Sequence, residues 1–269
     1  MGPDALEQAP GRLTMIARQT DYWLTVYRRT WRGSVVSSFV MPLFFVVAMG
    51  VLLGGFIDDG SADLEGAPTY LAFVAPGLVA AHVMQIAVGE VTWPVFGAIK
   101  WHKSYLGMAA TPLSPADIVA AHLLFVVFRL ATTSAVFLLV MAPFGVFASF
   151  PGTVLAFFAT LLVGMAFATP VYGLSAGLKD TTAFAVIYRV GIIPLFLFSG
   201  AFFPVSNLPD SIEWIAKVTP LWHGVDLTRM LTLGQVETGP ALVHLTYLLV
   251  LAGAGTWWSV HRLTRRLVV

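Results

Sequence analysis

The sequence contains no cysteine and is poor in charged residues. Of its 269 residues, 11% are charged and none is cysteine. Without cysteine, the chain can hold neither a disulfide nor a thiolate metal site. A soluble domain carries about a quarter charged residues, so this composition does not suit one. The formal net charge of +1 gives no sign of a nucleic-acid partner, and we expect none.

The chain also lacks short motifs of common enzymes. It has no G-x-x-x-x-G-K-[ST] phosphate loop and no H-E-x-x-H zinc pair. Its six histidines have no metal-ligand spacing, so we expect no metal site. We also expect no nucleophile elbow of the G-x-S-x-G type. If energy drives this protein, a separate subunit must supply it, and we expect this chain not to be an enzyme.

Apolar residues dominate what is present. They make up 58% of the chain, and several apolar runs exceed the roughly 20 residues that a helix needs to cross a bilayer. We therefore predict an all-α, polytopic membrane protein with six transmembrane helices. The predicted spans lie at about residues 35–57, 70–93, 117–143, 152–178, 183–203 and 241–261.

The N-terminal segment differs from the rest of the chain. We predict that residues 1–32 form a disordered start and then, from about residue 12, an amphipathic interface helix. Residues 33–269 would form the transmembrane domain. Trp23, Tyr27 and Trp31 fall near one face of this helix and its arginines lie elsewhere, which suits the headgroup plane. The alternative is a basic juxtamembrane stretch that only sets topology.

Basic residues divide unevenly between the two sides that six spans define. Eleven lie on one side: Arg12, Arg18, Arg28, Arg29, Arg32, Lys100, Lys103, Lys179, Arg262, Arg265 and Arg266. Two lie on the other side, namely Lys217 and Arg229. Because positively charged loops stay inside, we expect both termini to be cytoplasmic and the protein to be a multi-pass protein of the inner membrane.

The loop at 94–116, on the expected inner side, is a candidate coupling loop. A short amphipathic helix is predicted from Lys100 to Ala110, and Ser114 is predicted to cap the next helix, with Pro115 at its first position. The candidate coupling residues are Lys100, His102, Lys103, Tyr105, Thr111, Pro112, Leu113, Ser114 and Pro115. Such a loop can transmit a movement from a soluble partner to the membrane helices. The alternative is a loop that only lies on the lipid headgroups.

Three charged residues fall within predicted spans: Glu90, Arg129 and Arg189. A charge in lipid is costly and usually faces the bundle interior. Arg129 lies twelve residues beyond Asp117, or about 18 Å into its span. Glu90 is a possible partner for either arginine. The residues serve either as structural ion pairs or as contacts for a substrate headgroup.

The expected outer stretch at 204–231 is too apolar for a soluble loop and too broken for a span. We predict two short helices that form an extracellular re-entrant hairpin between spans five and six. Asn207 and Thr219 are predicted as the two helix caps. Candidate residues of this outer lip are Pro204, Asn207, Trp214, Pro220, Trp222 and His223. The lip either gates an exit or is a structural lid.

Two motifs resemble the membrane subunit of type-2 ATP-binding-cassette exporters. They are AATPLSPADI at 109–118 and SGAFFPVSNLPDSIEWIAKVTPLWHGVDLTR at 199–229. Together with the basic N-terminal helix and six spans, they are most similar to the permeases of the nodulation-factor and daunorubicin exporter group. One departure is the Lys100-Trp101-His102-Lys103 segment, where members often carry an acidic and arginine-rich one.

The resemblance implies partners that the chain itself does not contain. Two ATPase subunits would bind ATP and Mg²⁺, and a second permease, identical or homologous, would complete the complex within the lipid bilayer. The chain itself would carry no cofactor. Its substrate would be an amphipathic drug, lipid or glycolipid moved outward, and drug efflux would confer antibiotic resistance. The alternatives are a stand-alone secondary transporter or lipid scramblase and an intramembrane lipid-modifying enzyme.

Overall fold

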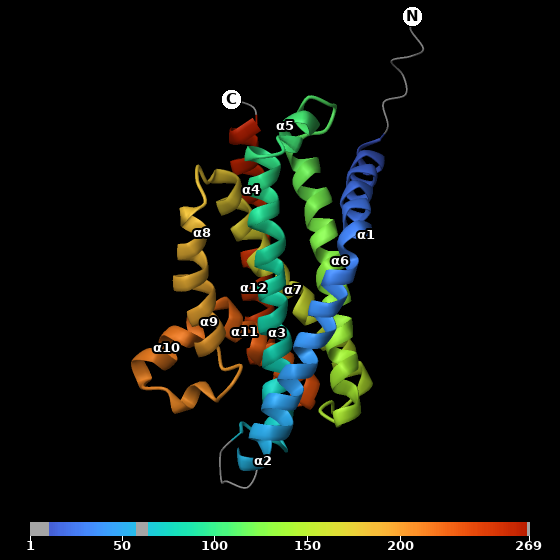
Figure 1. The fold of residues 1–269 in the computed structure, drawn as a ribbon. Helices are drawn as coiled ribbons and strands as arrows, with labels where there is room; N and C mark the ends of the chain where they lie inside the picture. The colour runs from blue at the N-terminus through green and yellow to red at the C-terminus, as the bar shows by residue number, and fades with distance from the viewer. Residues whose placement is uncertain (1–10, 58–63, 268–269) are drawn as a thin grey trace, which may run out of the picture.

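The computed structural model describes residues 11–57 and 64–267, and within them every regular element is helical. Figure 1 shows a bundle of long helices. The all-α prediction is confirmed. The expected disordered start at 1–11 falls almost wholly outside the described residues.

Four helices are long and apolar enough to cross a membrane. They cover Tyr70–Lys100, Pro115–Phe144, Phe150–Gly177 and Thr238–Leu267. The first combines α3 (Tyr70–Val91) with α4 (Trp93–Lys100), and the second combines α6 (Pro115–Met141) with the 3-10 helix η3 (Ala142–Phe144). The others are α7 (Phe150–Gly177) and α12 (Thr238–Leu267). They match the predicted spans two, three, four and six.

The predicted spans one and five correspond to shorter apolar helices, Pro42–Ile57 and Thr182–Phe198, so the length criterion does not confirm a count of six. Each contains a π-helical segment beside a proline. The π-helix η2 (Val46–Leu53) follows Pro42 and leads into α2 (Gly54–Ile57). The π-helix η4 (Ile187–Ile192) joins α8 (Thr182–Val186) to α9 (Ile193–Phe198), which contains Pro194. Because proline lacks the N–H that an α-helix needs, it favours this local change of winding.

The N-terminal helix is not separate from the first predicted span. α1 runs without a break from Arg12 to Phe45, so the predicted boundary between 32 and 33 lies inside it. The segment that we predicted as an interface helix packs lengthwise on α6, since Arg12 contacts Asp117 and Tyr27 contacts Arg129. These two contacts join α1 to α6 over its first half.

α3 lies at the centre of the bundle. In its most apolar stretch 83% of the residues are buried, and it packs against α6, α7 and α11 (Pro220–Leu233). Small residues allow this close approach: a Cβ added to Gly77 would lie 2.6 Å from the Cα of Ala201. Likewise, a Cβ added to Gly255 of α12 would lie 2.7 Å from Pro170 of α7. Glycine is therefore required where these backbones meet.

The short elements lie at opposite ends of the bundle. The starts of α1 and α5 (Ser104–Ala109) and the end of α12 share one end, while α2 lies at the other (Figure 1). We name the first of these the basic end, because most lysines and arginines of the chain gather there. Near the opposite end, a bend at 199–204 leads into η5 (Val205–Asn207), α10 (Asp210–Val218) and α11.

Candidate functional site

The candidate coupling loop is folded differently from the prediction. The single helix expected from Lys100 to Ala110 is broken, because α4 ends at Lys100 and α5 begins at Ser104. Backbone N–H groups of Trp101 and His102 both donate to the carbonyl of Gly97, which closes α4. Lys103 then takes a left-handed conformation, with φ of 53°, and this reverses the chain into α5.

Tyr105 anchors α5 to the bundle core. It is fully buried, and its hydroxyl group lies 2.7 Å from Nδ1 of His122 on α6. The hydroxyl group of Tyr172 on α7 donates to the Tyr105 oxygen at 3.0 Å. Burial raises the pKa of the Tyr105 phenol well above its ordinary value, so this group stays neutral. The structure therefore makes Tyr105 a core residue that positions α5, and its side chain is not on the outer surface of the loop.

The remaining candidate residues of the loop lie at or near the surface. Lys100, His102, Lys103, Thr111 and Pro112 are exposed, and Leu113, Ser114 and Pro115 are partly buried. The surface also carries two apolar side chains that were not among the candidates: Trp101 is 57% exposed and Leu106 is 43% exposed. The exposed face thus combines two lysines with two large apolar residues, of which tryptophan is a residue type enriched at protein contacts.

The predicted cap of α6 is confirmed and has a further partner. Ser114 and Asp117 form a reciprocal capping box, with Pro115 in the first turn. Asp117 also accepts a hydrogen bond from Nε of Arg12 at 2.5 Å, although that arginine is mostly exposed. Arg12 was not predicted in this role. The contact joins the start of α1 to the start of α6, so α1, α5 and α6 meet at the basic end.

The predicted pair of Glu90 and Arg129 is present. Nε of Arg129 donates to Oε1 of Glu90 at 2.8 Å, and Nη1 donates to the Tyr27 hydroxyl oxygen at 3.0 Å. The guanidinium carbon lies 4.6 Å from the centre of the Tyr27 ring, a cation–π contact. The other possible partner, Arg189, is exposed and makes no ion pair among the described residues. Arg129 is thus neutralised by Glu90 and held by α1.

The surroundings of Tyr27 also bear on the depth of Arg129. Arg28 and Arg29 follow Tyr27 directly and are exposed. Exposed arginines are costly within hydrocarbon, so we place this level at the membrane boundary. The span Pro115–Phe144 has 30 residues, or about 45 Å, against a hydrocarbon core of about 30 Å. Part of this helix therefore extends beyond the hydrocarbon, and the depth of about 18 Å for Arg129 stays a prediction.

Near the opposite end, a buried arginine holds the outer lip together. Arg229 of α11 donates to the carbonyl of Gly200 at 2.6 Å, to the carbonyl of Phe73 at 3.3 Å and to Oε2 of Glu65 at 2.8 Å. Its guanidinium carbon lies 3.9 Å from the centre of the Phe73 ring. Arg229 therefore ties α11 to the start of α3 and to the bend at 199–204. Sequence reasoning counted it only as an outer charge.

The outer helices agree with the prediction in part. The pair is present, and Thr219 caps α11, with Pro220 in its first turn. The predicted cap at Asn207 is wrong, because α10 begins at Asp210 after Pro209 and Asn207 ends η5. Among the lip residues, Pro204 and His223 are buried, Pro220 and Trp222 are partly buried, and Asn207 and Trp214 are exposed. His223 contacts His244 of α12 and stacks on Tyr247, which fixes it in packing.

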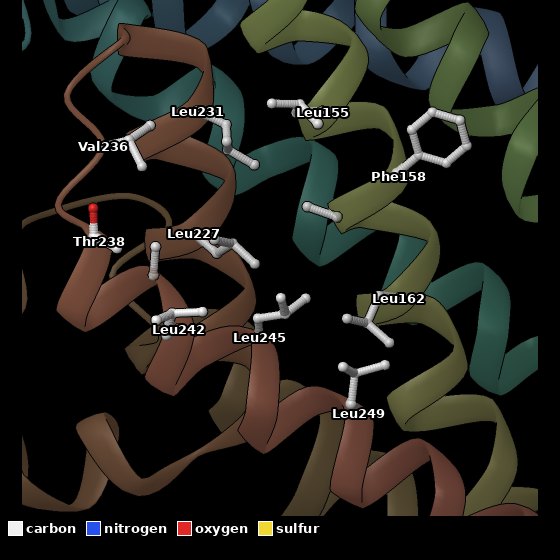
Figure 2. A pocket seen from close by; sticks show the side chains of 12 residues that line it. Leu155, Phe158, Leu162, Leu227, Leu231, Val236, Thr238, Leu242, Leu245 and Leu249 are labelled. Carbon is white, nitrogen blue, oxygen red and sulfur yellow. The ribbon is translucent and has the colours of Figure 1, made fainter.

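An apolar groove lies between α7, α11 and α12 (Figure 2). Its volume is about 490 Å³. Figure 2 shows Leu and Phe side chains from all three helices turned toward it, with Thr238 as the polar residue at one end. Among the described residues, its lining includes no charged side chain, so the groove suits hydrocarbon better than a charged headgroup.

One motif was overlooked in the sequence. Residues 173–177 read Gly-Leu-Ser-Ala-Gly, which has the G-x-S-x-G spacing that we expected to be absent. A nucleophile elbow is a sharp turn from a strand into a helix that exposes its serine. Here the segment lies within α7, and Ser175 is buried with no hydrogen-bond partner for its hydroxyl group. The segment is helix packing and not an elbow.

Comparisons with known proteins place these features in context. The family model described as ABC-2 type transporter matches residues 18–233. Nodulation protein J of Sinorhizobium fredii is 29% identical over 253 residues, which cover 91% of this chain and 94% of the relative. Nodulation protein J of Bradyrhizobium diazoefficiens is 29% identical over 254 residues, with the same coverage. That of Rhizobium leguminosarum bv. viciae is 28% identical over 220 residues, or 79% of this chain and 83% of the relative.

Proposed function

Since this chain belongs to the ABC-2 type transporter family, we propose that it is the membrane subunit of an exporter driven by a separate ATPase. Membership supports a transporter component and not an enzyme. The family match extends across α1 to α11 and includes the candidate coupling loop and the outer lip. Its partner, its topology and its substrate are parts of the same proposal.

The partner is an ATP-binding-cassette ATPase, present in two copies that bind ATP and Mg²⁺, and a second permease copy, identical or homologous, completes the complex. The observation that carries this proposal is the exposed face of α5 and its flanking turns. It presents lysines and large apolar residues, while Tyr105 beneath it is hydrogen-bonded within the core. If the ATPase displaces α5, α6 and α7 should move with it, because the buried hydrogen bonds of Tyr105 leave α5 little freedom to move alone.

Six crossings, with both termini cytoplasmic and the protein in the inner membrane, are the proposed topology. The starts of α1 and α5 and the end of α12 lie together, and the chain carries eleven of its basic residues on that side against two on the other. The positive-inside rule therefore favours a cytoplasmic basic end. The outer helices would then face away from the cytoplasm, and α10 and α11 would form the proposed re-entrant hairpin.

The proposed substrate is an amphipathic molecule, such as a lipid or glycolipid, that moves outward. None of the relatives bears a name that points to antibiotic efflux, so drug resistance is not proposed. The apolar bundle is compatible with a hydrocarbon chain, as the groove in Figure 2 illustrates.

Co-expression with the proposed ATP-binding-cassette ATPase tests this function. The complex should co-purify, hydrolyse ATP, and move a labelled amphipathic lipid across liposome membranes only when ATP is supplied. Movement by this chain alone, independent of ATP, would instead support a secondary transporter or scramblase.

A further inference from the structure

Another cavity, with one charged side chain in its lining, opens between α1 and α6. Its volume is about 460 Å³, and it is lined by Leu24, Tyr27, Arg28, Trp31 and Phe128. It differs from the groove in Figure 2 because it combines one cation with three aromatic side chains. This mixture suits a ligand with a negative group and an apolar part.

The cation in this cavity has no carboxylate partner. Arg28 is exposed, and so is Arg32 one turn later on the same stripe of α1. Neither forms an ion pair within the described ranges 11–57 and 64–267. The nearest acid on the helix, Asp21, lies seven residues from Arg28, or about 10 Å along the axis. The charge of neighbouring Arg129 is already balanced by Glu90. The cavity therefore carries unneutralised positive charge.

The cavity also lies at the level of a lipid headgroup. Exposed arginines on α1 place this level at the membrane boundary, because they are too costly in hydrocarbon. Trp31 is 46% exposed beside them, and tryptophan is enriched where the bilayer meets water. A phosphate group at this depth would meet Arg28, while the glycerol and upper acyl carbons would meet Trp31 and Phe128.

We propose that this α1–α6 cavity binds an anionic phospholipid of the surrounding leaflet, with its phosphate on Arg28. Arginine suits this role because its planar guanidinium group matches phosphate in two parallel hydrogen bonds. Arg32 adds attraction from the next turn. The proposal requires only that the chain is inserted in a membrane, so it stands or falls apart from the exporter function.

Quenching of Trp31 by brominated lipid tests the proposal. The full chain is placed in phosphatidylcholine nanodiscs that contain increasing fractions of brominated phosphatidylglycerol or, in parallel, brominated phosphatidylcholine. The signal of Trp31 is the difference between the wild type and Trp31→Phe. We expect half-maximal quenching at a lower fraction of phosphatidylglycerol than of phosphatidylcholine. Arg28→Gln should raise the phosphatidylglycerol fraction at half-maximal quenching about fivefold. One arginine near a membrane surface contributes about 1 kcal/mol to the binding of anionic lipid.

Two further variants test whether the lipid preference depends on the positive charge of Arg28. Arg28→Lys should retain most of the preference for phosphatidylglycerol, and Arg18→Gln, an exposed arginine of α1 outside the cavity, should leave it unchanged. Equal quenching by the two lipids in the wild type would overturn the proposal, as would an Arg28→Gln profile identical to the wild type. If inorganic phosphate removed the preference, the cavity would be a general anion site and the lipid proposal would be wrong.

Discussion

The hydroxyl group of Tyr105 lies 2.7 Å from Nδ1 of His122, in a fully buried contact between α5 and α6. The same oxygen accepts a hydrogen bond from Tyr172 of α7. One side chain of the coupling loop thus contacts two long helices of the bundle. Under the proposed function, this arrangement would carry a movement of the loop into the bundle.

Removing the Tyr105 hydroxyl group should uncouple the loop from the bundle. Tyr105→Phe leaves polar atoms of His122 and Tyr172 without their partner in the core, at a cost of about 1–3 kcal/mol. We expect a lower melting temperature and less transport for each ATP hydrolysed, while the ATPase still binds. Leu106→Ala, on the exposed face next to Tyr105, is the matched comparison. It should weaken ATPase binding and leave the melting temperature unchanged; the reverse pattern would refute the two assignments.

Charge reversal on the exposed face should weaken the ATPase contact. The double variant Lys100→Glu and Lys103→Glu changes two exposed charges that form no ion pair within residues 11–57 and 64–267. Rim charges chiefly change association rates and their salt dependence, so we expect roughly tenfold slower binding at low salt in a surface-binding assay. Arg265→Glu with Arg266→Glu, at the same end of the bundle, is the control. Unchanged ATPase association in the loop variant would exclude docking through these lysines.

The pair of Glu90 and Arg129 should behave as a unit. Arg129→Leu leaves Glu90 without its partner in a largely buried site, and breaking such a pair costs about 3–5 kcal/mol. The double variant with Glu90→Gln should lose less stability than the sum of the two single variants. A thermal unfolding series of the four proteins measures this coupling. Additive losses would show that the pair is not a structural unit and would favour a direct role for Arg129 in the transport pathway.

Weakening the hydrogen bonds of Arg229 should make the outer lip more mobile. Arg229→Lys retains a charge for Glu65 but cannot donate to Gly200 and Phe73 in the same geometry. We expect faster hydrogen exchange at residues 199–207 and in α10, with the basic end unaffected. Lys217→Gln breaks a surface pair with Glu213, which contributes little to stability, and should change neither region. If exchange in the lip stayed at the wild-type rate, Arg229 would not hold it closed.

Local signals in the sequence predicted local structure. The caps at Ser114 and Thr219 are present because a hydroxyl group, a following proline and the first helical turn lie within a few residues. The pair of Glu90 and Arg129 could be expected because two charges in apolar segments require partners. Asn207 failed as a cap because α10 begins further along the chain, at Asp210 after Pro209.

Contacts between distant segments could not be predicted in the same way. The burial of Tyr105 depends on His122 and Tyr172, which no spacing relates to it. The role of Arg229 depends on the carbonyl groups of Gly200 and Phe73, and every residue offers such a group. The continuity of α1 likewise follows from its packing on α6, and its own composition suggested a boundary near residue 33.

We propose above that the chain is the membrane subunit of an exporter and takes its energy from a separate ATPase at the α5 surface. The direct measurement is ATP-dependent movement of a labelled amphipathic lipid in liposomes that contain this chain and its ATPase. We predict movement that requires both proteins and ATP, and that falls sharply in the Lys100→Glu and Lys103→Glu variant. Movement at the same rate without the ATPase, or with no ATP present, would contradict the claim.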